Sequence, residues 1–283
     1  MNYHPIGDFD SGFGGLTVLK DMERVLPGYD FLYLGDNARA PYGNRSFEIV
    51  HTYTLEAVRW LFLQGCPLVI LACNTASAKA LRTIQQTDLP QIAPGRRVLG
   101  VIRPVTERVG TLTQSRHIGI LATAGTVESQ SYVIEINKYF PDVTVVQEAC
   151  PMWVPLVENN EFDSEGADYF VKQHMERLLD ADSRIDTVIL GCTHYPLLQR
   201  KIRHFLPREI QFVSQGEIVA KSLADYLDRH PEIAGACSQQ GKRDFYTSEA
   251  APVFDRSATI FYGRPIRSRS VARLEFPFHE PLS

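Results

Sequence analysis

Short apolar runs alternate along the chain with longer segments that have the apolar periodicity of helices. The runs show little polar alternation, which is typical of strands buried on both faces of a parallel sheet. We therefore predict an α/β fold with mostly parallel sheets flanked by helices. The predicted strands are Ile6–Asp10, Phe31–Leu34, Leu68–Cys73, Val98–Gly100, His117–Thr123, Val143–Val146, Thr187–Cys192 and Ile210–Val213. The predicted helices are Leu16–Leu26, Ser46–Gln64, Thr75–Ile84, Val105–Leu112, Ser129–Tyr139, one through Glu158, Ser164–Leu179 and Glu217–Asp228.

Two of the apolar runs repeat one another. Leu68–Cys73 continues into Asn-Thr and Thr187–Cys192 continues into Thr-His, so each run ends in a cysteine. The offset of 119 positions (192 − 73) also superimposes Val69 on Val188. We interpret this repeat as two pseudosymmetric α/β domains with the active site in the cleft between them. The predicted domains are residues 1–99 with 212–283, and residues 100–211.

Composition narrows the class of protein. The 283 residues carry 29 Lys and Arg against 33 Asp and Glu, without the basic stripe that nucleic-acid binding requires. The chain enters its first strand without a signal-peptide pattern and has no long uncharged apolar run, so we expect a cytoplasmic protein that does not enter a membrane. Its 5 cysteines form no CxxC pair, which favours reduced thiols over a disulfide framework or a zinc ribbon.

The duplicated cysteines are the candidate chemical groups. In open α/β sheets the ligand lies outside the carboxyl ends of the strands, so two halves that face each other present Cys73 and Cys192 from opposite sides. An enzyme that inverts the configuration of a carbon atom needs two such opposed bases, because the proton is removed from one face and returned to the other. Each cysteine is predicted to begin a helix, whose free N–H groups and dipole favour a thiolate. A lone cysteine after an apolar strand is usually a small buried hydrophobe, and only the duplication favours chemistry.

Other polar residues at the predicted strand ends fit the same site. His194 follows Cys192 by two positions and, with an ordinary pKa of about 6.5, is able to relay a proton or stabilise a thiolate. Asp10 has two interpretations, a partner for Cys73 or the N-cap of the next helix. Small hydrogen-bonding residues at the strand ends predict a cradle for carboxylates. They are Ser11, Asn74, Thr75, Thr123, Thr126 and Thr193.

The sequence predicts no cofactor and no metal ion. No lysine follows a predicted strand directly, which disfavours a pyridoxal phosphate Schiff base. The turn Gly12–Thr17 has some likeness to a dinucleotide-binding loop, with Asp36 as a possible ribose ligand. However, Thr17 stands where the third glycine is needed, and Asp8 and Asp10 would place negative charge beside a pyrophosphate.

Four blocks of the sequence, in order, resemble those of glutamate racemases in the aspartate/glutamate racemase superfamily. A further segment, Cys150-Pro151-Met152 with Val157-Glu158, is similar to another element of that family. The four blocks are Phe9-Asp10-Ser11-Gly12 with Gly14-Gly15-Leu16-Thr17-Val18, Gly35-Asp36 with Pro41-Tyr42-Gly43, Ala72-Cys73-Asn74-Thr75-Ala76, and Gly191-Cys192-Thr193-His194-Tyr195-Pro196.

The resemblance implies a cofactor-independent two-base racemase that interconverts L- and D-glutamate, with D-glutamate used for peptidoglycan synthesis. It implies that Cys73 serves the D-enantiomer and Cys192 the L-enantiomer, that Asp10 assists Cys73 and His194 assists Cys192, and that Glu158 participates in catalysis. It is compatible with a homodimer. The implied substrate-binding residues are Asp10, Ser11, Tyr42, Gly43, Asn74, Thr75, Thr123, Thr126, Thr193 and His194.

The chain departs from the family pattern at Asp8, where an apolar residue is usual, at Asn37, where Thr or Ser is more common, and at Val105, where Gly is frequent. Three alternatives stay open. One is an aspartate or hydantoin racemase with the same two thiols. Another is a thiol hydrolase that uses Cys192 and His194 alone, and the last is a non-enzymatic binding role of the kind suggested for some family members.

Overall fold

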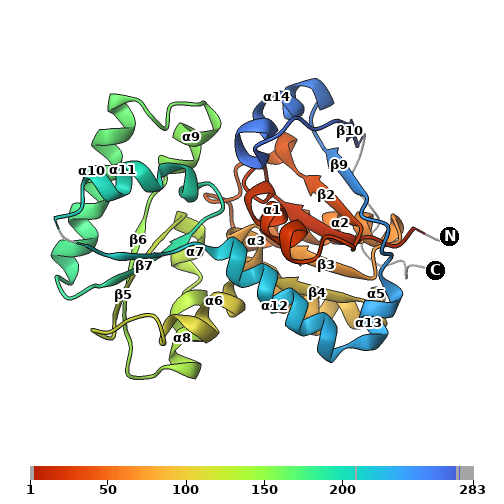
Figure 1. The fold of residues 1–283 in the computed structure, drawn as a ribbon, viewed down its shortest axis with the longest axis horizontal. Helices are drawn as coiled ribbons and strands as arrows, with labels where there is room; N and C mark the ends of the chain where they lie inside the picture. The colour runs from red at the N-terminus through yellow and green to blue at the C-terminus, as the bar shows by residue number, and fades with distance from the viewer. Residues whose placement is uncertain (1–2, 208, 272–273, 275–283) are drawn as a thin grey trace.

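The computed structural model describes residues 3–207, 209–271 and 274. Two lobes lie side by side, each built on its own parallel sheet (Figure 1). The first sheet has the order β10-β9-β2-β1-β3-β4 and the second the order β6-β5-β7-β8. The strands are β1 (Ile6–Asp10), β2 (Phe31–Gly35), β3 (Leu68–Leu71), β4 (Arg97–Gly100), β5 (His117–Ala122), β6 (Thr144–Ala149), β7 (Thr187–Gly191), β8 (Gln211–Val213), β9 (Arg243–Thr247) and β10 (Ser268–Ser270). The α/β fold predicted from the sequence is confirmed.

The two lobes share a strand order. β2-β1-β3-β4 in the first lobe matches β6-β5-β7-β8 in the second, so β3 and β7 are equivalent. In each lobe the strand before the cysteine lies beside the strand that opens the lobe, because β3 pairs with β1 and β7 pairs with β5. The strand order reverses between these neighbours, and ligands of open α/β sheets bind outside the strand ends at such a reversal. The fold therefore places both cysteines at the positions where a binding site is expected.

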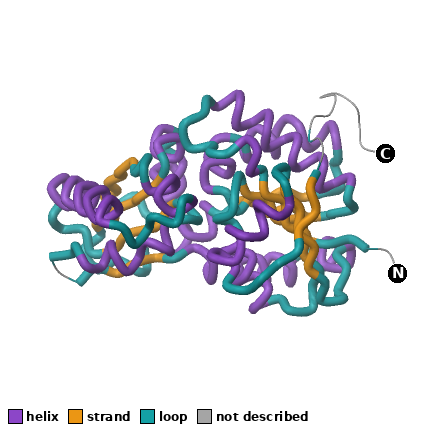
Figure 2. The backbone as a smooth tube through the Cα atoms, turned by 90° about the horizontal axis from the view of Figure 1, so that it is seen from above, coloured by secondary structure: helices purple, strands orange, loops and turns teal. Residues whose placement is uncertain are grey.

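Helices cover both faces of each sheet, as the views in Figures 1 and 2 show. No helix in the described part of the chain has the length and apolar character needed to cross a bilayer. The α-helices are α1 (Leu16–Val25), α2 (Phe47–Leu63), α3 (Asn74–Lys79), α4 (Leu81–Thr83), α5 (Leu89–Ile92), α6 (Ile102–Val109), α7 (Ala124–Glu128), α8 (Ser131–Tyr139), α9 (Trp153–Glu158), α10 (Glu165–Ala181), α11 (Gln199–His204), α12 (Gln215–Arg229), α13 (Pro231–Ala236) and α14 (Ala251–Tyr262). Short 3-10 helices η1 (Asn37–Arg39) and η3 (Tyr195–Leu198) and the π-helical η2 (Ile84–Asp88) complete the list.

Local sequence signals explain the ends of the long helices. Ser46 precedes α2 and its hydroxyl accepts the N–H of Ile49, which satisfies one of the free donors of the first turn. The same helix ends before Gly65, whose φ of +91° is left-handed backbone that favours glycine, as the sequence predicts. Ser164 caps α10 in the same way, accepting the N–H of Ala167.

The helix predicted over Thr75–Ile84 is interrupted in the structure. Helix α3 ends at Lys79, and α4 and η2 then continue the chain to α5. The helical path therefore extends beyond the predicted end at Ile84, as far as Ile92. Pro90 is compatible with this helical path because it occupies the first turn of α5, where its missing N–H is not needed.

The chain beyond α12 extends the first sheet. The sequence predicts only a mixed tail that returns to the first lobe. In the structure β9 pairs with β2, and β10 pairs with β9. Helix α14 then packs over this sheet, with Phe254 and Phe261 stacked against Phe13.

A carboxyl group is buried without a partner in the centre of the first sheet. Asp8 lies on β1, pairs with Tyr33 on β2 and Ile70 on β3, and is fully buried. Neither of its oxygens has a hydrogen-bond partner among the residues that the structure describes. Burial raises the pKa of this carboxyl well above its ordinary value, and the charges of Asp10 and Glu23 raise it further.

Replacing Asp8 should stabilise the fold. We expect Asp8→Val to increase the free energy of unfolding at neutral pH by about 1–3 kcal/mol, because it removes a buried polar group that has no partner. The pKa of Asp8 in the folded protein lies above the unfolded value of about 3.9. The titration of Asp8 therefore does not destabilise the parent below about pH 3.9, and it lowers the stability of the parent as the pH rises from about 3.9 towards the folded pKa. Urea unfolding between acid and alkaline pH measures the difference. Asp8→Asn is the control without the titration, and lower stability of Asp8→Val at every pH would contradict the prediction.

Candidate active site

A cavity of about 50 Å³ lies between the carboxyl ends of the two sheets. Cys73 from the first lobe and Cys192 from the second are both on its wall. Each follows the equivalent strand of its own sheet, so the duplication in the sequence becomes two thiols on one cavity. The residues that line it are Ser11, Ala40, Pro41, Tyr42, Gly43, Asn44, Cys73, Asn74, Thr75, Thr123, Pro151, Val154, Pro155, Glu158, Cys192, Thr193 and His194.

Cys73 is the N-cap residue of α3, as predicted, and its side chain is 6% exposed. Its sulfur lies 3.3 Å from Ser11 Oγ. Burial and then the charge of Asp10 raise the pKa of the Cys73 thiol to about 12, against the opposing hydrogen bonds from Ser11 and the Ala76 N–H. The expectation that the helix start favours a thiolate here is therefore outweighed by desolvation, and Cys73 is a neutral thiol near pH 7.

Cys192 is held differently. The prediction that it begins a helix is wrong, because the next element is the short 3-10 helix η3, whose N-cap is His194. The Cys192 sulfur lies instead 3.8 Å from Nδ1 of His194. The neighbour of the Cys192 sulfur is thus the His194 side chain, whereas Cys73 lies at a helix terminus.

His194 is a buried cation in this site. Its Nε2 lies 3.0 Å from Glu158 Oε1. Burial alone would lower the pKa of His194, but its hydrogen bonds with Cys192 and Glu158 outweigh burial and raise the pKa to about 10. The imidazolium has an N–H group on each nitrogen, one facing Glu158 and the other facing the Cys192 sulfur.

Hydroxyl groups brace the lobes across the cavity. Thr75 Oγ1 in the first lobe lies 2.9 Å from Thr123 Oγ1 in the second. Thr126 Oγ1 lies 3.5 Å from Thr75 Oγ1 and 3.1 Å from Thr123 Oγ1. On the other side of the cavity Thr193 donates a hydrogen bond of 3.3 Å to Asp10. The small polar residues for which the sequence predicts a carboxylate cradle are therefore contributed by both lobes.

Two of the predicted site residues, Asp10 and Thr126, are buried behind the cavity rather than on its wall. Asp10 accepts the N–H of Gly12 at 2.8 Å. The N-cap residue of α1 is Gly15, without a side-chain cap, so the interpretation of Asp10 as that N-cap is wrong. Burial raises the pKa of Asp10, opposed by the charge of His194.

Glycine residues allow the lobes to approach at two points. A Cβ atom at Gly14 would lie 2.1 Å from Thr193 Oγ1 and 2.5 Å from His194 Nδ1. On the opposite side, the Gly125 N–H donates to the Gly43 carbonyl at 2.8 Å, and a Cβ at Gly43 would lie 3.0 Å from Thr123. The loops that carry the candidate residues can close only because these side chains are absent.

Part of the cavity wall was not predicted from the sequence. Ala40 and Asn44 flank the predicted Tyr42 loop after β2, and Val154 and Pro155 lie on α9 after β6. For Ala40 and Asn44, the sequence signal is their position in the loop after the end of β2. Val154 and Pro155 read in the sequence as ordinary apolar helix residues, so their facing the cavity could not be predicted.

The arrangement does not fit a dinucleotide. Asp36, the possible ribose ligand, already accepts hydrogen bonds from Tyr42 (2.5 Å), Arg39 (2.7 Å) and Ser248 (2.7 Å). The glycine turn is occupied as well, since Gly14 packs against His194. Among the described residues, no group of three or more His, Cys, Asp or Glu is placed to hold a metal ion.

Comparison with known proteins assigns this arrangement to a family. The profile of the Asp/Glu/Hydantoin racemase family matches residues 15–223. The chain belongs to this family. It is 40% identical to the glutamate racemase of Geobacter metallireducens over 264 residues, 93% of this chain and 94% of the relative. It is also 40% identical to the glutamate racemase of Dinoroseobacter shibae, over 95% of this chain and 99% of the relative.

Solved structures agree with the sequence relatives. Glutamate racemase isoform RacE1 from Bacillus anthracis superimposes with a TM-score of 0.86 at 33% identity, covering 96% of this chain and 98% of that one. The glutamate racemase of Francisella tularensis in complex with D-glutamate gives a TM-score of 0.85 at 27% identity, covering 97% and 99%. The enzyme class of the chain is therefore that of an amino-acid racemase.

The charge on Glu158 should set the protonation of His194. We expect Glu158→Gln to lower the pKa of His194 by roughly 1–3, because it removes the carboxylate that faces Nε2. The folded pKa lies above the unfolded value of about 6.5, so this ion pair stabilises the parent below that pH and the stabilisation is lost as the pH rises through about 10. NMR titration of the His194 ring measures the pKa. Glu161→Gln, an exposed site just beyond α9, is the matched control. An unchanged pKa in Glu158→Gln would show that the carboxylate does not hold the imidazolium.

Proposed function

We propose that the protein interconverts L- and D-glutamate by a two-base mechanism that uses Cys73 and Cys192 and no cofactor. The observation that carries this proposal is the pair of thiols on one cavity, each at the equivalent strand end of its own lobe. The glutamate racemases among the relatives, and the Francisella tularensis structure in complex with D-glutamate, support glutamate as the substrate.

The surroundings of the two thiols fit one direction of the reaction. With L-glutamate bound, the Cys192 thiolate beside the His194 imidazolium removes the α-proton, so the C–H bond breaks and an S–H bond forms at Cys192. Cys73, still protonated, donates its proton to the opposite face of the carbon. The product is D-glutamate, with Cys73 left as the thiolate. Exchange of protons with solvent after release restores the first state.

The reverse direction needs a thiolate at Cys73. The Ser11 hydroxyl at 3.3 Å and the Ala76 N–H are the donors that stabilise this anion. Asp10 opposes it through its negative charge. Asp10 would assist Cys73 only as a neutral carboxyl or as a partner for the substrate ammonium group, which is compatible with the raised pKa of Asp10.

The α-carbon of an amino acid is a very weak acid, so the carbanion must be stabilised. Hydroxyl groups of Thr75 and Thr123 and the free N–H groups at the start of α3 are preorganised donors for the substrate carboxylates. A cavity this small leaves little room for water beside a bound substrate, which strengthens these interactions. Ser11, Tyr42, Gly43, Asn74 and Thr193 line the same space and complete the proposed binding site.

Racemisation by single cysteine variants tests the proposal. We expect Cys73→Ala and Cys192→Ala each to reduce inversion of L-glutamate by at least roughly 10²–10⁴-fold, since each removes an essential proton carrier. Chiral chromatography of glutamate and aspartate incubated with the parent and each variant measures both rate and substrate preference. In heavy water, Cys73→Ala should still exchange the α-proton of L-glutamate slowly without forming D-glutamate.

Cys237→Ala is the matched control, because Cys237 is also buried but lies outside the cavity. Faster turnover of aspartate than of glutamate by the parent would favour the aspartate racemase alternative. Near-parental inversion by Cys73→Ala would refute the two-base mechanism. The same variant distinguishes a thiol hydrolase built on Cys192, His194 and Glu158, for which Cys73 is dispensable.

We propose further that the two predicted domains, residues 1–99 with 212–283 and residues 100–211, separate to admit the substrate, with the boundaries moved so that β4 stays whole in the first domain and β8 whole in the second. A cavity of about 50 Å³ holds only a few water molecules at roughly 10–15 Å³ each, so glutamate needs more room than the closed lobes offer.

The D-glutamate that is formed would serve peptidoglycan synthesis, which complementation of a D-glutamate auxotroph tests.

Glutamate should restrain the separation of the two domains. We expect saturating glutamate to slow amide hydrogen exchange around both Cys73 and Cys192, because the ligand bridges loops of both lobes. Mass spectrometry of the exchanged protein with and without glutamate measures the protection. Helix α10, far from the cavity lining, is the internal reference, and protection confined to one lobe would argue against a shared cleft.

A further inference from the structure

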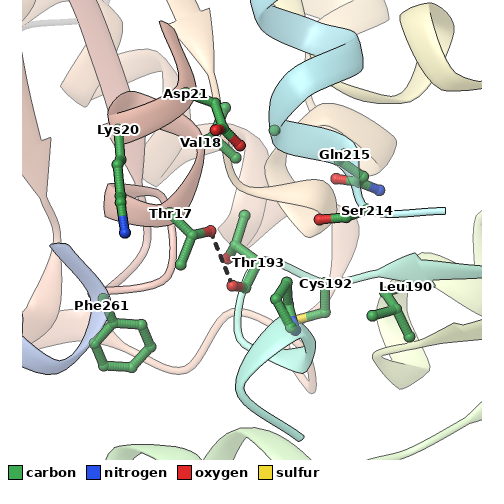
Figure 3. A pocket seen from close by; sticks show the side chains of 12 residues that line it. Thr17, Val18, Lys20, Asp21, Leu190, Cys192, Thr193, Ser214, Gln215 and Phe261 are labelled. Atoms are coloured by element: carbon green, nitrogen blue, oxygen red, sulfur yellow. Dashed lines mark hydrogen bonds between the residues drawn. The ribbon is translucent and has the colours of Figure 1, made fainter. Parts of the chain in front are cut away.

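A second cavity, of about 220 Å³, lies behind the site at the start of α12. In Figure 3, Gln215 and Ser214 lie on one side of it, Thr17 and Phe261 lie on the other, and Cys192 is close by. Gln215 is the first residue of α12, one residue beyond the end of β8, where the chain leaves the second lobe and returns to the first. Its side chain is nonetheless 4% exposed, which is unusual for glutamine.

Gln215 is buried because it pairs with Asn74. The Asn74 Nδ2 donates to Gln215 Oε1 at 2.9 Å, and Gln215 Nε2 donates to Asn74 Oδ1 at 2.9 Å. Tyr132 on α8 donates to the same Asn74 oxygen at 2.8 Å and accepts a hydrogen bond from Gln215. Three elements distant in sequence, α3, α8 and α12, therefore meet at one carboxamide.

These bonds decide which end of the Asn74 carboxamide is available to the cavity that Asn74 lines. Both lone pairs of its oxygen are occupied, by Gln215 and Tyr132. The second N–H of Asn74 has no protein partner in the described part of the chain. A carboxamide rotated by half a turn would offer an oxygen instead, which repels a carboxylate. Gln215 holds this orientation, because turning the Asn74 carboxamide alone would place its oxygen against Gln215 Oε1 and its NH₂ group against Gln215 Nε2.

We propose that Gln215 is a positioning residue of the racemisation site, which fixes the Asn74 carboxamide with its N–H towards the substrate and holds the adjoining Cys73 in place. The inference rests on the proposed function. Asn74 is the first residue of α3 and Cys73 is its N-cap, so the contact that holds Asn74 in place also restrains Cys73. The far end of the link is rigid, since Gly216 packs so tightly on α1 that a Cβ would lie 2.1 Å from Asp21 Oδ2.

A double-mutant cycle tests whether Gln215 acts through Asn74. We expect Gln215→Leu to lower kcat/KM for glutamate by roughly 10–100-fold, the effect of leaving a buried donor and acceptor without partners. Asn74→Ala should lower it at least as much. The double variant should be within about twofold of Asn74→Ala, because coupled residues are not additive. Glu217→Gln, exposed in the first turn of α12, should behave as the parent.

Gln215→Glu adds a readout that a purely structural role would not produce. Its ionised carboxylate accepts from Asn74 but cannot donate, whereas the protonated form restores both bonds. We expect its kcat/KM, relative to the parent, to recover as the pH falls. This variant also replaces Gln215→Leu if the latter does not fold.

Alkylation of Cys73 by iodoacetamide, followed by mass spectrometry, gives a measurement that does not depend on turnover. Gln215→Leu and Asn74→Ala should each increase the rate several-fold, and the double variant should increase it no further. A parent that fails to racemise glutamate would refute the proposed function, while this cycle would still report on the coupling. Multiplicative effects of Gln215→Leu and Asn74→Ala in both assays, or a pH profile of Gln215→Glu parallel to the parent's, would overturn the inference.

Discussion

The structure depends on the close approach of two sheet ends that leaves very little volume between them. Gly14 and Gly43 permit this approach, because a side chain at either position would meet a threonine of the other lobe. Once the ends are this close, polar groups that would be solvated on a single lobe must find partners across the gap. The hydrogen bonds from Thr75 to Thr123 and from Thr193 to Asp10 meet that need.

Burial in so small a space acts differently on the two thiols. At Cys73 the desolvation dominates, and the sulfur keeps its proton. At Cys192 the sulfur has the His194 imidazolium as its neighbour, and Glu158 at the edge of the cavity stabilises that imidazolium. A duplicated scaffold thus carries two chemically distinct ends. The difference originates in side chains outside the repeated strands.

The sequence was sufficient to predict strands β1 to β8 and the position of a cysteine after each of two equivalent strands, because buried parallel strands are continuous apolar runs and a repeat at an offset of 119 positions is easily seen. It could not predict the break in the helix after Cys73 or the 3-10 helix after Cys192, since local propensity does not distinguish them from a regular helix. The burial of Gln215 could not be predicted from the sequence either. A glutamine that begins a helix reads as solvated, and only the tertiary contact with Asn74 shows otherwise.

The unequal surroundings of the thiols have a thermodynamic consequence. L- and D-glutamate are mirror images with the same free energy in water, so their equilibrium mixture is racemic whatever the protein places around its sulfurs. The imidazolium beside Cys192 and the burial of Cys73 therefore cannot enrich one enantiomer. In the proposed two-base reaction they affect only which protonation state of the free enzyme predominates, and with it which enantiomer that state accepts. At low substrate concentration both directions must run with the same efficiency, and any asymmetry of the site is visible only near saturation.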